Sequence, residues 1–185
     1  YQEEMRDGLR PRFVGPPPFT MTPQLPPRDP SVAGKERAKL DKFRVRESVA
    51  PPPGPILSLM STFSVAKGDD IRMVFDASKS KLNEALFAPW FSLATADAMA
   101  RTVDVDYFGA DNDYGEMFYN FWLHEDLRPY CGVDMTHQYP EEARLQPNSV
   151  LWNVFTRPAM GLRPSPYQSV QGALRAKRLM LGDHT

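Results

Sequence analysis

Residues 111–123 read Asp-Asn-Asp-Tyr-Gly-Glu-Met-Phe-Tyr-Asn-Phe-Trp-Leu, and the rest of the chain is organised around them. The stretch places the carboxylates of Asp111, Asp113 and Glu116 directly ahead of an apolar, aromatic run. Neighbouring negative charges repel one another and resist burial, yet the apolar run fixes them beside a core. A divalent cation relieves that repulsion, and Mg²⁺ prefers one or two carboxylates together with substrate phosphates. The alternative is a solvated acidic turn that leads into an amphipathic helix.

The charged residues are segregated along the chain. A length of 185 residues predicts one domain, or most of one, and 42% apolar residues are enough for a core. The formal net charge is −1, but residues 51–150 carry 15 acidic against 7 basic side chains, whereas 1–50 and 151–185 are basic. An acidic middle with basic ends suits a metal centre within a phosphate-binding surface, and it also suits an ordinary surface.

The single cysteine, Cys131, excludes a disulfide framework and fits an intracellular compartment, cytoplasmic or nuclear. We expect its thiol to be a small buried group rather than a nucleophile. No apolar run approaches the ~20 residues that a membrane span needs, so we expect no membrane partner. A first residue other than Met and an uncharacteristic last stretch lead us to expect a fragment of a longer chain.

Two parts of the chain differ in composition. Residues 1–55 hold 12 of the 19 prolines, which predicts a largely extended or disordered leader. Within it, residues 34–49 form a basic helix candidate with a narrow apolar stripe at Leu40 and Phe43. We interpret this as a marginal, solvated helix; the alternative is a basic arm that touches nucleic acid. Order is expected to begin near Ile56 and to extend through residues 56–185.

The second part predicts an α+β fold with a small antiparallel sheet packed on helices. Residues 56–60 and 63–65 are predicted to form a strand or a strand pair. After a Gly-Asp-Asp turn, residues 71–75 alternate and are predicted to form the second arm of a hairpin. Residues 82–88, 91–101 and, loosely, 117–127 are helix-prone, and 102–108, 133–136 and 151–155 are strand candidates. The clearest helix begins at Ser165, with Ser165 as N-cap, Gln168 completing a capping box and Gly182 as terminator.

Three stretches together resemble the reverse transcriptases, the RNA-directed DNA polymerases with a right-hand fold. Residues 65–76 and the following Leu82-Asn83 resemble the fingers hairpin of that family, which ends in an Arg…Asp…Leu-Asn pattern. Residues 113–123 resemble its first palm motif, and residues 160–168 resemble a motif usually written Gln-Gly-x-x-x-Ser-Pro. The resemblance starts near Phe63 and covers roughly two thirds of the chain.

The resemblance implies a fingers and partial-palm fragment with these roles. Lys67 and Arg72 would contact the triphosphate of the incoming nucleotide, and Phe118 would lie against its sugar and exclude a 2′-hydroxyl. Asp113 would be the catalytic, metal-binding carboxylate in a two-ion Mg²⁺ site, with Asp111 as its rival. Gly161 and Ser165 would support the pocket for template and nucleotide. Met160 departs from the family pattern, which has Gln at that position.

The family's Asp-Asp pair is absent after the Ser-Pro helix, because the chain stops at Thr185 before such a hairpin. Two-metal phosphoryl transfer needs carboxylates on both sides of the ion pair, so this chain should not be a competent polymerase alone. The partners implied are an RNA or DNA template-primer and deoxynucleoside triphosphates. Two alternatives remain: a non-catalytic remnant or domesticated module that binds nucleic acid or protein, and an unrelated Mg²⁺-dependent phosphotransfer domain.

Overall fold

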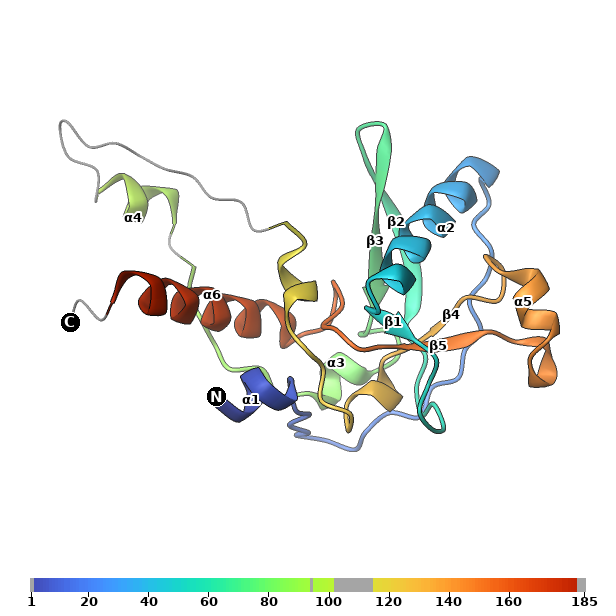
Figure 1. The fold of residues 1–185 in the computed structure, drawn as a ribbon, viewed down its shortest axis with the longest axis horizontal. Helices are drawn as coiled ribbons and strands as arrows, with labels where there is room; N and C mark the ends of the chain where they lie inside the picture. The colour runs from blue at the N-terminus through green and yellow to red at the C-terminus, as the bar shows by residue number, and fades with distance from the viewer. Residues whose placement is uncertain (1, 94, 102–114, 183–185) are drawn as a thin grey trace.

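The fold is a mixed α+β body built on two small antiparallel sheets (Figure 1). The computed structural model describes residues 2–93, 95–101 and 115–182. One sheet has the strand order β1 (Val49–Ala50), β5 (Trp152–Phe155), β4 (Gly132–Asp134), and the other is the hairpin of β2 (Ser61–Lys67) and β3 (Asp70–Asp76). This confirms the predicted α+β class with small antiparallel sheets and helices. The strand predicted over 102–108 lies outside the described residues.

The hairpin consists of β2 (Ser61–Lys67) and β3 (Asp70–Asp76), joined by a two-residue turn at Gly68-Asp69. Gly68 has φ +58°, a left-handed conformation that glycine adopts without steric cost. Along β3, Ile71, Met73 and Phe75 are buried, so alternate residues face the core. The predicted hairpin is therefore present, but its first strand begins at Ser61 rather than near Ile56.

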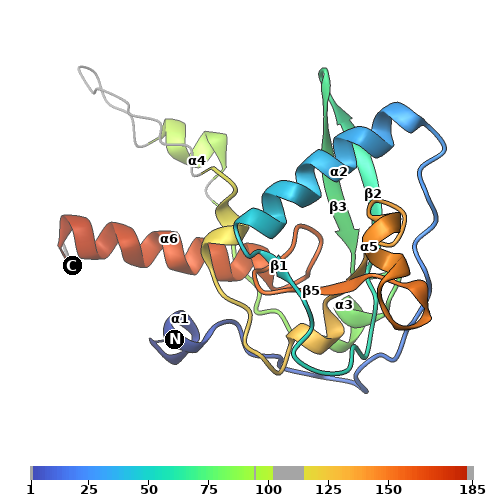
Figure 2. The same cartoon turned by 45° about the vertical axis from the view of Figure 1, so that its right-hand side comes forward.

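Helix α2 (Pro30–Val45) runs alongside the hairpin in both views (Figures 1 and 2). Asp29 caps it, since its carboxylate accepts a hydrogen bond from the Ser31 backbone N–H at 2.8 Å. Leu40 and Phe43 are buried in the same core cluster as the inner face of β3. The apolar stripe seen in the sequence is thus matched by the apolar face of the hairpin.

Residues 30–50 therefore differ from the expected largely extended or disordered leader. This segment forms α2 and the strand β1 (Val49–Ala50). β1 belongs to the three-stranded sheet, where it pairs with β5 (Trp152–Phe155). Residues 8–28 are mostly extended, as prolines favour, but isolated bridges tie Leu9 to Leu123 and Thr20 to Ser58. The sequence could not show this because the surfaces that hold the segment come from distant parts of the chain.

The third strand of the β1-β5-β4 sheet is β4 (Gly132–Asp134), which pairs with β5. The strands predicted near 133–136 and 151–155 are present. Only one turn of the loosely predicted 117–127 helix forms, as a 3₁₀ helix. The shorter elements are α1 (Gln2–Asp7), α3 (Leu82–Ala85), α4 (Ala96–Ala100), η1 (Met117–Asn120), η2 (Arg128–Tyr130), α5 (Pro140–Arg144) and η3 (Pro147–Ser149).

Helix α6 (Ser165–Leu181) reaches away from the body (Figure 1). Its predicted N-cap is wrong, because Pro164 occupies that position and no side chain caps the helix. The Ser165 hydroxyl instead donates to the Ala159 carbonyl at 3.1 Å, since the side chain points into the core. The helix ends before Gly182, with φ +80°, as predicted. Within the described part of the chain, no helix has the length and apolar character needed to cross a membrane.

The packing of α2 gives the first prediction. Leu40 is 1% exposed, so Leu40→Ala should lower the free energy of unfolding by about 3 kcal/mol through lost burial and a residual cavity. Val45, in the same helix, is 85% exposed, and Val45→Ala should change it by less than about 0.5 kcal/mol. Urea denaturation measures both. Equal, small effects would mean that α2 is not part of the folded body.

Candidate functional site

A cavity of about 330 Å³ lies between α2, the hairpin, residues 116–119 and Met160. We call it the hairpin cavity. It combines cationic side chains from α2 and the hairpin with aromatic side chains from α2 and η1. Segments that are far apart in the sequence therefore share one hollow, and a hollow with cations at its rim and an apolar wall can accept an anionic ligand with a flat or apolar part.

Lys67 and Arg72 both line the hairpin cavity. Lys67 pairs across the strands with Asp70, and Arg72 pairs with Val65. Because directly opposed residues share a face and side chains alternate along a strand, Lys67 and Arg72 project on the same face of the hairpin. Both residues are exposed, so their charged ends can reach a ligand.

Glu116 and Phe118 line the opposite wall of the cavity. Glu116 adopts a left-handed conformation with φ +52°, and the one-turn helix η1 follows it. Its carboxylate forms an ion pair with Arg46, the C-cap residue of α2. Phe118 is half-buried. The structure thus brings together Lys67, Arg72 and Phe118, whereas Asp111 and Asp113 lie outside the described residues.

An aromatic cluster supports the cavity from beneath. Phe43 of α2 contacts Tyr119 of η1, with ring centroids 4.8 Å apart, and Phe75 of β3 contacts Phe155 of β5 edge-on at 4.5 Å. Such contacts add to the burial of the rings and fix their relative positions. Burial raises the pKa of the Tyr119 phenol above its usual value, so the hydroxyl stays neutral.

Two lysines of α2 donate hydrogen bonds to the region of the hairpin turn. The Lys35 ammonium donates to the Asp69 carbonyl at 2.7 Å, and the Lys39 ammonium donates to the Asp70 carboxylate at 2.5 Å. Hydrogen bonding to Lys39, and then to the Ile71 backbone N–H, lowers the pKa of Asp70 below its usual value. Asp70 is therefore ionised at neutral pH, and the turn is held at the cavity rim.

The turn that carries Met160 and Gly161 packs directly on β3. The Phe75 N–H donates to the Met160 carbonyl at 3.0 Å. Gly161 has φ +108°, and a Cβ there would lie 2.2 Å from the Phe75 carbonyl oxygen. Only glycine allows this approach, which explains the residue type in the motif without any ligand. Met160 lines the hairpin cavity through this arrangement.

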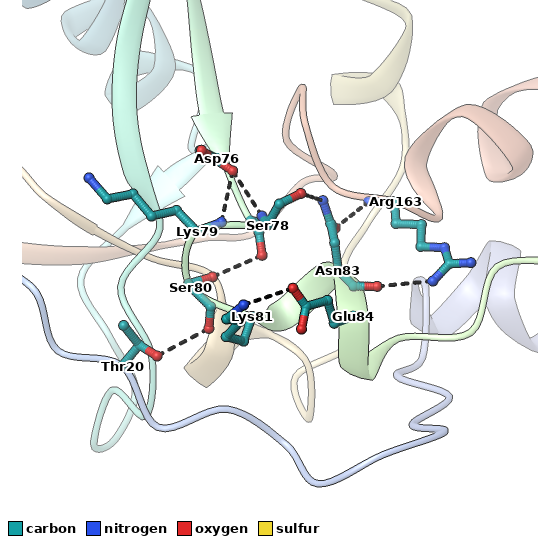
Figure 3. A network of polar contacts seen from close by, with 10 residues as sticks. Thr20, Asp76, Ser78, Lys79, Ser80, Lys81, Asn83, Glu84 and Arg163 are labelled. Carbon is teal, nitrogen blue, oxygen red and sulfur yellow. Dashed lines mark hydrogen bonds and ion pairs between the residues drawn. The ribbon is translucent and has the colours of Figure 1, made fainter.

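Asn83 ties the base of the hairpin to the same turn (Figure 3). Its side-chain amide donates to the Gly161 carbonyl at 2.8 Å and accepts from the Arg163 N–H at 2.7 Å. The Arg163 guanidinium also donates to the Asn83 carbonyl at 3.2 Å. Asp76 accepts from the N–H groups of Ser78 and Lys79, each at 2.9 Å, and so shapes the turn that leads to Asn83.

The residues of the Asp…Leu-Asn pattern therefore have structural roles. Asp76 forms a side-chain-capped turn, Leu82 is fully buried, and Asn83 joins two distant segments. The Asp…Leu-Asn pattern was visible in the sequence, but its spacing did not indicate that Asn83 would bond to Gly161 and Arg163. Ser165 is fully buried and does not line the hairpin cavity. Its hydrogen bond to the Ala159 carbonyl connects the start of α6 to the chain just before the Gly161 turn.

The acidic side chains that line the cavity already have cationic neighbours. Asp70 pairs with Lys39 and Glu116 pairs with Arg46. Over residues 2–93, 95–101 and 115–182, no group of three or more His, Cys, Asp or Glu side chains is arranged to hold a metal ion. The carboxylates expected to bind Mg²⁺ are those of Asp113 and Asp111, which lie outside the described residues.

Other candidate groups fit a functional site less well. Cys131 is buried, as expected, and burial raises the pKa of its thiol to about 12, so it is not a nucleophile at neutral pH. Two hollows of about 410 and 440 Å³ lie along β2. Their walls come mainly from β2 and residues 22–29, which include three prolines. Neither hollow combines several cations with an aromatic wall opposite, as the hairpin cavity does.

Comparison with models of protein families finds no family that matches this chain, and comparison with curated proteins finds no match either.

The Gly161 contact gives the second prediction. Gly161→Ala should lower the free energy of unfolding by about 3 kcal/mol or more, because the new methyl group meets the Phe75 carbonyl and the positive φ is strained. Gly68→Ala, at φ +58° with no atom within 4 Å of the added Cβ, should cost only about 1 kcal/mol. Guanidinium denaturation compares them. A tolerated Gly161→Ala would contradict the close approach.

Proposed function

We propose that the hairpin cavity binds a Mg²⁺-bound deoxynucleoside triphosphate, as part of the fingers and partial palm of a reverse-transcriptase-like RNA-directed DNA polymerase. The observation that carries this proposal is the meeting of Lys67, Arg72 and Phe118 around one cavity. The resemblance gave these three residues roles on one ligand, although Phe118 lies more than forty positions beyond Arg72 in the sequence. Such a meeting is what a shared nucleotide site requires.

Lys67 and Arg72 supply the phosphate-binding part of the proposed site. A guanidinium can hold two phosphate oxygens at once, whereas an ammonium acts as a compact point charge. Their common position on one face of the hairpin lets both approach the same triphosphate. In nucleotidyl transfer, these cations would stabilise the charge that develops on the transferring phosphoryl group and on pyrophosphate.

Phe118 supplies the proposed sugar contact on the wall opposite the hairpin. Its half-buried ring lines the cavity next to Tyr119, whose ring packs on Phe43. The ring of Phe118 can exclude a 2′-hydroxyl by its bulk, which is the role that the resemblance assigns to it. The contact between Tyr119 and Phe43 supports the neighbouring part of the wall.

Asp113 is the proposed metal ligand and catalytic carboxylate, with Asp111 as the second candidate. Both precede Glu116, which lines the cavity, and the three residue steps from Asp113 to Glu116 can span at most about 11 Å. When bound, Mg²⁺ neutralises phosphate charge and orients the reacting groups. The cavity carboxylates of Asp70 and Glu116 have protein cations beside them, so they are weaker candidates for this role.

The proposed reaction of the full enzyme is attack of a primer 3′-hydroxyl on the α-phosphorus of the nucleotide, with release of pyrophosphate. It needs an RNA or DNA template-primer and, beside the metal-binding carboxylate, the Asp-Asp pair that the family carries on a later hairpin. For the hairpin cavity we propose nucleotide binding, at an intracellular location that a buried single cysteine fits. Gly161 and Ser165 would contribute by fixing the turn beside the cavity.

The proposal gives the third prediction. Lys67→Met should weaken binding of Mg²⁺·dATP to the chain about tenfold, because one charge-assisted phosphate contact is lost. Lys79→Met is the matched control, since Lys79 is exposed but does not line the hairpin cavity, and it should leave the dissociation constant unchanged. Isothermal titration calorimetry at low salt measures both constants.

Asp113→Asn separates the metal from the phosphate part of the same site. It should reduce the dependence of dATP binding on Mg²⁺ while the Lys67 effect persists. Equal weakening by Lys67→Met and Lys79→Met would indicate unspecific charge attraction and would contradict the proposal. A non-catalytic nucleic-acid-binding module predicts instead that the chain binds single-stranded RNA or DNA but no dATP.

A further inference from the structure

The hairpin cavity contains a third cation that the resemblance to reverse transcriptases did not assign. Lys39 extends from α2, and it lines the cavity with Lys67 and Arg72. Its side chain is 27% exposed, so its charge is only partly screened by water. Lys39 therefore belongs to the same electrostatic environment as the proposed phosphate ligands.

The ammonium of Lys39 has a carboxylate partner. It donates to Asp70 at 2.5 Å, while the other carboxylate oxygen of Asp70 accepts from the Ile71 N–H at 2.8 Å. The Asp70 side chain is 55% exposed and also lies opposite Lys67 across the strands. One aspartate thus stands between two cations at the cavity rim.

A single carboxylate is a weak competitor for these cations. A nucleoside triphosphate carries several negative charges and many acceptor oxygens, so it can replace one exposed carboxylate as the partner of a lysine. The displaced Asp70 carboxylate oxygen can turn to water because the side chain is more than half exposed, and the other carboxylate oxygen can still accept from the Ile71 N–H. The exchange needs no movement of α2.

We propose that Lys39 is a third triphosphate-binding residue and that Asp70 is its resting counter-ion, which the bound triphosphate displaces. This inference rests on the proposed function of the cavity and adds to it a residue outside the hairpin. It makes α2 part of the nucleotide site. It also makes Asp70 an element that weakens triphosphate binding, since the ligand must break the Lys39–Asp70 pair.

Lys35 provides a matched control on the same helix. It lies one helical turn before Lys39 and also contacts the hairpin turn, but it donates to the Asp69 backbone carbonyl rather than to a carboxylate. It does not line the hairpin cavity. Removing its charge changes the general attraction of α2 for anions without removing a cavity ligand.

The test is calorimetric titration of the full chain with inorganic tripolyphosphate and, separately, with dATP. Lys39→Met should weaken binding of both ligands about tenfold, Lys39→Arg should stay within about threefold of the wild type, and Lys35→Met should be unchanged within about twofold. Asp70→Asn should strengthen binding several-fold, because the competing charge is lost while the amide oxygen still accepts from Ile71. Circular dichroism and urea midpoints confirm that each variant folds.

The outcomes separate this inference from the proposed function. If Lys67→Met weakens binding and Lys39→Met does not, the nucleotide site stands and Lys39 has no part in it. If Asp70→Asn weakens binding as much as Lys39→Met, Asp70 positions Lys39 instead of competing, and the exchange is wrong. If the wild-type chain binds neither ligand at millimolar concentration, both proposals fail. Binding of tripolyphosphate without binding of dATP would support the phosphate-binding role of the cations and would contradict the proposed contact between Phe118 and the sugar.

Discussion

The structure depends on the contact between the Gly161 turn and the β3 strand. The two backbones approach so closely that a Cβ on Gly161 would lie 2.2 Å from the Phe75 carbonyl, and the Phe75 N–H donates to Met160 at the same place. Asn83 then fastens the turn to the segment that follows the hairpin. Because of these bonds, the hairpin keeps one orientation relative to the Gly161 turn, which lines the cavity through Met160.

Charge compensation is the second constraint on the cavity. Its two described carboxylates are neutralised by cations from α2 or its C-cap, Lys39 for Asp70 and Arg46 for Glu116. Ion pairs of this exposure contribute little to stability, so their role is better sought in ligand binding. A cavity whose carboxylates are already paired presents its remaining cations to an anion, and α2 becomes a wall of the site as well as a cover for the hairpin.

Local patterns predicted the hairpin well because alternating apolar residues and a glycine turn are short-range signals. Helix α6 and strand β5 were also predicted. The predicted N-cap role of Ser165 was wrong, because its hydroxyl donates to a carbonyl in the core rather than capping the helix. The leader was misjudged at α2, because Leu40 and Phe43 form a weak stripe whose partner, the inner face of β3, is fixed only by tertiary structure.

The candidate site shows the same limit. The resemblance to reverse transcriptases suggested Lys67, Arg72 and Phe118, and all three line the hairpin cavity. Lys39 carried no signal, because a lysine on a basic helix looks like any solvated charge until the helix is placed beside the hairpin. Asn83 belongs to the Asp…Leu-Asn pattern of the sequence. Its bonds to Gly161 and Arg163 connect residues about eighty positions apart, so they depend on the fold.

Methionine methyl groups offer the most direct test that this cavity is the nucleotide site. Met73, Met117 and Met160 line it, whereas Met180 lies in the last turn of α6, which reaches away from the hairpin (Figure 2). In a chain labelled with ¹³C at the methionine methyls, Mn²⁺·dATP should broaden the NMR signals of the first three and spare Met180. Broadening of Met180 with the cavity methyls unaffected would contradict the account.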